Sequence, residues 1–132
     1  MKKNKQIIDK YNPEIYPRLL YVAKNCTEES INKEFSYRDD SPIVLGRGEY
    51  LAMTHPVIHK KTNKLCVLVT LDMQEIKKEP AIKKVGICAH EADHVKHMFA
   101  EDIDLHIDYK SQEASAYLVQ WATECIYATM TK

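Results

Sequence analysis

Apolar residues recur along the chain at spacings that predict where its strands form. Residues 65–71 (Leu-Cys-Val-Leu-Val-Thr-Leu) are almost continuously apolar, which predicts a strand that is buried on both faces. Residues 61–63 (Lys-Thr-Asn) are turn formers, so a hairpin with a strand inside residues 49–59 is expected. Pro56 interrupts that strand and favours an edge or a bend. Residues 42–46 predict one further short strand.

Helical patterns flank this central region. Asn12 and Pro13 form a favourable helix start, because Asn caps a helix well and Pro suits its first position, so a helix is predicted to follow them. A short helix is expected over residues 28–35. Two longer helices are predicted over residues 80–100 and 111–130, the second with the serine at its start as the N-cap. The order helix, sheet, helix, helix predicts an α+β fold in a single domain, residues 1–132.

Charge and composition exclude several classes of partner. The 19 basic and 19 acidic residues leave no net charge, so no electrostatic case exists for a nucleic-acid partner. No segment approaches the ~18 to 20 apolar residues of a membrane span, and the N-terminus lacks the apolar core of a signal peptide. The 4 cysteines are widely spaced and are expected to be reduced and buried, as in a cytoplasmic protein.

One five-residue motif carries chemistry. Residues 90–94 are His-Glu-Ala-Asp-His, and on a helix His90 and His94 lie one turn apart on the same face, where both imidazoles can reach one metal ion. Glu91 then stands beside the metal-bound water as a general base. Imidazole and carboxylate ligands favour Zn²⁺.

The predicted helix has an apolar stripe that leaves the two histidines on the opposite side. The stripe consists of Val85, Cys88, Ala92, Val95 and Phe99. A solvated outer face with two polar residues would have the same pattern, so geometry alone does not separate this alternative from a metal site.

A catalytic zinc site needs a third protein ligand. A histidine at the metzincin spacing would fall on Ala100, which excludes that subclass. Glu113 starts the next predicted helix, which would pack back over the motif, and it is the preferred third ligand. The alternative is a helix N-terminal carboxylate that the helix dipole favours. The fallback ligands are Asp102, Asp104 and His106.

Residues 89–95 (Ala-His-Glu-Ala-Asp-His-Val), followed by residues 112–121 (Gln-Glu-Ala-Ser-Ala-Tyr-Leu-Val-Gln-Trp), resemble the small zincin-type metallopeptidase domains encoded by bacteriophages. The resemblance covers about residues 65–127. It implies a zincin-like fold: a small twisted mixed β-sheet, an active-site helix and a C-terminal glutamate helix. It also implies that His90, His94 and Glu113 bind zinc, with Glu91 as the base.

The resemblance leaves different functions open. The favoured one is a zinc metallopeptidase that hydrolyses a peptide or protein, since a purely structural zinc site has no need of Glu91. The alternatives are a regulatory peptidase that cleaves one repressor, and a structural head or tail component of the virion. That component would form a ring with other phage proteins or copies of itself, and its metal site would be retained or degenerate. Candidate donors to the oxyanion are Tyr117, Tyr109, His106 and Tyr127. A substrate could bind as an extra strand at an exposed sheet edge.

Overall fold

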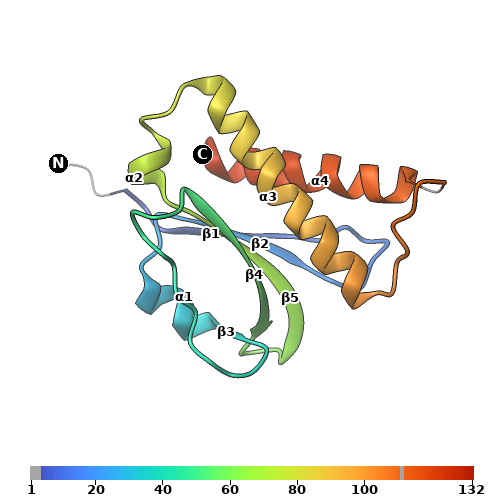
Figure 1. The fold of residues 1–132 in the computed structure, drawn as a ribbon. Coiled ribbons are helices and arrows are strands. Elements are labelled where there is room, and N and C mark those ends of the chain that lie inside the picture. Colours follow the sequence, from blue (N-terminus) through green and yellow to red (C-terminus); the bar gives the residue numbers. More distant parts are fainter. Residues whose placement is uncertain (1–3, 111) are drawn as a thin grey trace.

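Five strands form one mixed sheet in the computed structural model, which describes residues 4–110 and 112–132 (Figure 1). The strands are β1 (Ile7–Tyr11), β2 (Leu20–Lys24), β3 (Phe35–Tyr37), β4 (Ala52–His59) and β5 (Lys64–Leu71). Across the sheet the order is β1-β2-β5-β4-β3. The β2–β5 pair is parallel and the other pairs are antiparallel. The predicted hairpin is confirmed as β4 and β5.

Helices lie on both faces of this sheet (Figure 1). They are α1 (Glu28–Glu34), α2 (Met73–Ile76), α3 (Ala81–Asp102) and α4 (Glu113–Met130). The predicted α+β class is confirmed, as are the helices expected over residues 28–35 and 80–100. Ser111, the expected cap of the last helix, lies outside the described residues, and Gln112 precedes the first turn of α4. None of the described helices has the length and apolar character that a membrane span requires.

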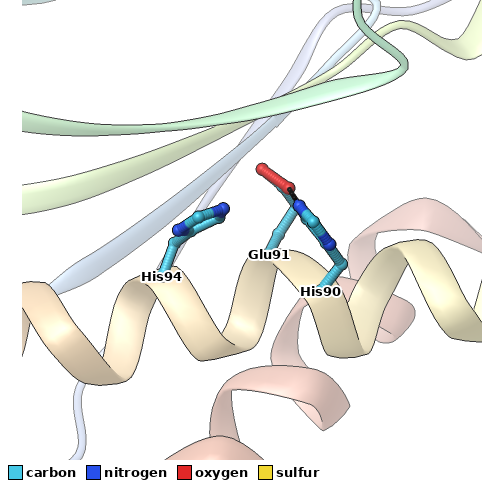
Figure 2. Close-up of side chains that lie close together, drawn as sticks. All are labelled: His90, Glu91 and His94. Carbon is cyan, nitrogen blue, oxygen red and sulfur yellow. Dashed lines mark ion pairs between the residues drawn. The ribbon is translucent and has the colours of Figure 1, made fainter.

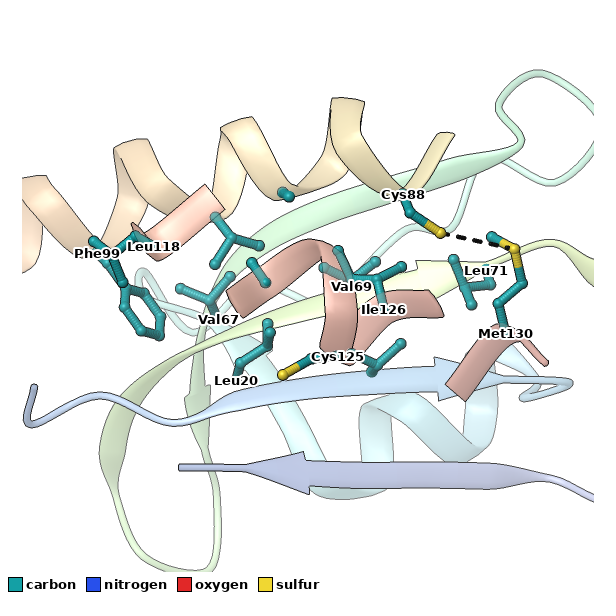
Figure 3. Close-up of a cluster of buried hydrophobic side chains, with 14 of the residues drawn as sticks. Leu20, Val67, Val69, Leu71, Cys88, Phe99, Leu118, Cys125, Ile126 and Met130 are labelled. Atoms are coloured by element: carbon teal, nitrogen blue, oxygen red, sulfur yellow. Dashed lines mark hydrogen bonds between the residues drawn. The ribbon is translucent and has the colours of Figure 1, made fainter. Parts of the chain in front are cut away.

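The two central strands are buried on both faces, which is what the continuous apolar pattern of residues 65–71 predicts. Val22 and Val69 point to the side covered by α3 and α4, where they join the larger core cluster (Figure 3). Their neighbours Tyr21 and Leu68 point to the other side and pack with Ile31 of α1. All four cysteines are free and buried, as expected.

The helix predicted after Asn12 is wrong. The segment instead leads without a helix into β2, which pairs antiparallel with β1, the strand before Asn12, with Ile7 paired to Lys24 and Tyr11 to Leu20. All five residues of β2 are buried, and β2 also pairs with β5 on its other side. Pairing within the sheet therefore outweighs the local helix signal, which Pro17 already weakens because it interrupts helical hydrogen bonding.

The short strand predicted over residues 42–46 is also wrong. Its apolar residues Ile43 and Leu45 are buried against α1 as expected of a strand. The backbone N–H of Ile43, however, donates to the side-chain Oδ1 of Asn32 at 2.7 Å, and that amide donates back to the carbonyl oxygen of Ile43 at 2.9 Å. The side chain of Asn32 thus binds the backbone of Ile43 in place of a partner strand.

The C-terminal end of α3 is fastened to the sheet side by two guanidinium groups. Arg38 donates from both terminal nitrogens to the carboxylate of Asp102, at 2.5 and 2.7 Å. Arg18 donates from Nε to the same carboxylate at 3.1 Å. Burial alone would raise the pKa of Asp102, but the hydrogen bonds and charge of Arg38 hold it below the usual value. These contacts fix the position of the helix that carries the motif.

Candidate metal centre

The motif residues lie in the middle of α3, on two different sides of the helix. Ala92 and Val95 are completely buried against the sheet and α4, whereas His90 and His94 are exposed. Figure 2 shows the two histidines and Glu91 rising from α3 toward the strands, with α4 on the other side of the helix. The predicted opposition between apolar stripe and histidines is confirmed, except that Val85 is exposed and lies outside the core.

The side chains of His90, Glu91 and His94 form a compact donor group. One ligand atom from each residue lies within 4.8 Å of the others. Two donors bound to one zinc ion at about 2.1 Å are at most about 4.2 Å apart, so the group is close to the required spacing. Both histidines are exposed, and rotation of their side chains can supply the remaining adjustment. The two imidazoles suit zinc and would hold it, while the Glu91 carboxylate lies beside them as the candidate base and not as a ligand.

Glu91 differs from the histidines because it is buried, with 4% of its surface exposed. Thr54 of β4 donates from its hydroxyl to Oε1 of Glu91 at 3.1 Å. The other carboxylate oxygen, Oε2, lies 4.0 Å from Nε2 of His90. One oxygen is thereby anchored to the sheet while the second faces the histidines. A carboxylate held in this way is oriented to accept a proton from a molecule bound beside the imidazoles.

The part of the sheet beside this group has an edge that no described strand pairs. The edge strand β3 pairs only with Val57–His59 at the end of β4. Within the described chain, no strand pairs with residues 52–56 on the side opposite β5. Pro56, predicted to mark an edge, lies in this uncovered part. Since Thr54 contacts Glu91, the open edge runs directly past the donor group.

A cleft of about 700 Å³ opens between α3 and the segment that leads into β4. His90 and Glu91 form part of its wall, so the donor group borders the cleft. Tyr50 and Leu51 line it from the β4 side, and Ile82 lines it from the first turn of α3. A molecule in this cleft would lie in contact with the candidate metal centre.

The structure does not bring the predicted third ligand into the group. Glu113 is exposed at the first position of α4, and the only donor group found among the described residues is that of His90, Glu91 and His94. Its role as a zinc ligand therefore stays a prediction. Of the fallback ligands, Asp102 is engaged by Arg38 and Arg18.

The tyrosines proposed from the sequence as oxyanion donors do not line the cleft. Tyr117 is exposed on α4 and lines a different groove, together with Trp121 and Ile15. Two residues that sequence reasoning missed contact the site instead, namely Thr54, which orients Glu91, and Tyr50, which lines the cleft. Neither residue gave a signal in the sequence, because their contact with the motif depends on how α3 packs against β4.

A scan against protein-family models and searches of curated proteins and of solved structures find no match for this chain. The resemblance to phage zincins thus stays a prediction that depends on the residues themselves. The function has to be argued from the chemistry of the donor group and its surroundings.

Proposed function

We propose that this chain is a zinc-dependent metallopeptidase of zincin-like architecture. One observation carries the proposal: His90, Glu91 and His94 converge on α3 next to the uncovered edge of β4. A helix with this donor group supplies a place for the ion, and an open strand edge supplies a place for a peptide backbone. Either feature alone is common, but their juxtaposition suits hydrolysis of an extended peptide.

His90 and His94 would hold the ion through their ring nitrogens. When bound, zinc would lower the pKa of a coordinated water to about 7 and so supply hydroxide at neutral pH. Glu91 accepts a proton on Oε2, the oxygen that faces His90, while Thr54 keeps Oε1 in place. Glu113 stays the proposed third protein ligand.

The unpaired backbone groups of residues 52–56 would bind the substrate as an additional strand. Main-chain hydrogen bonds of this kind recognise any extended peptide, and the adjoining cleft must then provide side-chain selectivity. The edge passes Thr54, so a peptide on it lies beside Glu91 without further movement of the sheet.

Metal content and hydrolysis test this function together. Purified wild-type protein should hold one zinc per chain by elemental analysis, and the substitution His94→Ala should remove it. Glu91→Gln should keep the zinc but lose hydrolysis of a denatured protein substrate. Glu113→Gln should lose zinc if Glu113 is the third ligand. Wild-type protein that takes up no zinc, even after incubation with it, would sink the proposal.

A structural role in a phage head or tail is the second candidate. The observation that favours it is the donor group itself, which within the described residues contains two histidines and no third ligand besides the proposed base. Such a component would bind zinc weakly or not at all. It would be found in stoichiometric amounts in particles and would assemble into rings in solution, with no loss of function in Glu91→Gln.

A further inference from the structure

The cleft beside the donor group has walls that differ in chemistry from the centre itself. Tyr50 and Leu51 stand on one side, and Ile82 and Ile87 of α3 stand on the other. Ile82 is 77% exposed and Tyr50 is 55% exposed, although both are large apolar or aromatic residues. Apolar side chains that face each other across an open cleft gain free energy when an apolar group displaces the water between them.

Charge does not favour a charged occupant. The two ionic residues of the cleft wall outside the donor group are Glu49 and Lys83, which carry opposite charges and are both exposed. The residues outside the donor group therefore give the cleft no net charge. The apolar walls are therefore the feature that discriminates between side chains.

The backbone at Tyr50 belongs to a tight turn. The backbone N–H groups of Glu49 and Tyr50 both donate to the carbonyl oxygen of Gly46, at 3.1 and 3.2 Å. Gly46 has a φ of +58°, and a Cβ atom at this position would lie 2.9 Å from Cδ2 of the Tyr50 ring. The turn thus needs glycine both for its backbone conformation and for the close approach of the ring.

The cleft is continuous with the open edge of β4, because Leu51 and Ala52 line it at the point where that strand begins. A peptide on the edge of β4 passes Glu91 near Thr54, and a neighbouring residue of the peptide then reaches the cleft. Successive side chains of a strand alternate between faces, so one side chain at a time is presented to the cleft.

We infer that this cleft binds a large apolar side chain of the peptide substrate, close to the cleaved bond, with Tyr50 and Ile82 as the residues that determine specificity. The inference rests on the proposed peptidase function for the identity of the ligand as a peptide. Gly46 acts as a positioning residue through Tyr50.

Methyl NMR of the Glu91→Gln protein tests the inference without requiring hydrolysis. Two extended peptides that differ only in one central residue, leucine or aspartate, are titrated into protein labelled at isoleucine methyl groups. The leucine peptide should shift the methyl signals of Ile82 and Ile87 at roughly ten-fold lower concentration than the aspartate peptide. The methyl of Ile15, which is 79% exposed in a different groove, should not move. Equal responses to both peptides, or none at Ile82, would overturn the inference.

Substitutions separate the ring of Tyr50 from its hydroxyl. Tyr50→Ala and Ile82→Asp should each weaken binding of the leucine peptide about ten-fold, while Tyr50→Phe should stay within about two-fold. The matched controls are Ile15→Asp and Tyr127→Phe, both at exposed positions outside the cleft. Unchanged binding in Tyr50→Ala would remove Tyr50 from the site.

The two proposals fail in different ways. If the leucine peptide binds as described but wild-type protein hydrolyses no peptide, the proposed specificity of the cleft is supported and the proposed peptidase function is refuted. If wild-type protein cleaves peptides with no preference for an apolar residue near the cleaved bond, the proposed peptidase function is supported and the proposed role of the cleft is refuted.

Discussion

Two pairs of histidines in this molecule have the same spacing of four residues and entirely different surroundings. His90 and His94 lie on α3, and their ring centroids are 5.0 Å apart. His55 and His59 lie on β4, where four residues span roughly 13 Å because each residue advances about 3.3 Å. A helix brings residues four apart onto one turn, whereas a strand places them on one face but separates them.

The pairs also differ in how their ring nitrogens are used. Nδ1 of His55 contacts the Tyr37 hydroxyl at 3.0 Å, and Nε2 contacts the Thr70 hydroxyl at 2.9 Å. His59 pairs through Nε2 with Glu34 at 3.1 Å. The exposed rings of His90 and His94 contact each other and face Glu91. Burial with dedicated partners makes a histidine structural, and exposure next to a second donor makes it available to a ligand.

The largest expected difference between the two histidine pairs is the loss of bound zinc when a histidine is replaced by alanine. His90→Ala and His94→Ala should each abolish stoichiometric zinc, a greater loss than the roughly 10- to 100-fold in affinity that removing a partner of a ligand costs. His59→Ala should leave zinc content unchanged at a temperature where the variant stays folded. Elemental analysis after dialysis measures this, with His97→Ala as the control on the same helix. If the His94→Ala protein kept its zinc, His94 would not be a zinc ligand, and the two pairs would not differ in metal binding.

Each histidine pair has a neighbouring glutamate. Substitution of the two glutamates should have the second-largest difference in effect, measured as the change in kcat. Glu91→Gln should lower kcat by roughly 10²- to 10⁴-fold with zinc retained, because a general base contributes about that much. Glu34→Gln, next to His59, should leave kcat unchanged. Steady-state hydrolysis of a peptide, with zinc content measured in parallel, gives the result. Full activity in Glu91→Gln would show that this carboxylate is not the base.

Of the buried pair, His55 should make stability depend on pH. Burial lowers the pKa of His55 from 6.5 to about 4. The folded state then keeps His55 neutral while the unfolded chain takes up a proton below pH 6.5. Stability is therefore complete above pH 6.5 and falls as the pH drops toward 4, by about 3 kcal/mol in total. Urea unfolding at pH 7 and pH 4.5 measures the loss, and His55→Gln should show a smaller difference between the two. An equal difference would assign the dependence to other groups.

The smallest expected effect concerns the contact between β4 and the motif. Thr54→Val removes the hydroxyl that donates to Glu91, and kcat should fall roughly ten-fold with KM unchanged, since a hydrogen bond to a charged group contributes about 1.5 kcal/mol or more. Thr54→Ser should restore most of the rate, which a purely structural role would not require. A change in KM alone would show that Thr54 acts on the substrate and not on Glu91.

Local sequence signals located the motif helix, the hairpin and the short helix over residues 28–35, but they failed in the segment that follows Asn12. The helix of His90 was predictable because its apolar stripe follows the helical period, and residues 65–71 were predictable because they are apolar throughout. The segment after Asn12 carried a helix start yet forms the strand β2, because β2 gains more from pairing with β1 and β5 than from local caps. No local pattern contains that information.

The residues of the candidate site likewise fall into two groups, those that the sequence alone brings together and those that depend on tertiary packing. His90, Glu91 and His94 are neighbours in the sequence, so the spacing of the motif and the geometry of one helix suffice to bring them together. The contact of Thr54 with Glu91, the open edge at residues 52–56 and the place of Tyr50 in the cleft depend on how α3 lies against β4. These residues are far from the motif in sequence, and only packing of the helix on the sheet determines which of them meet it.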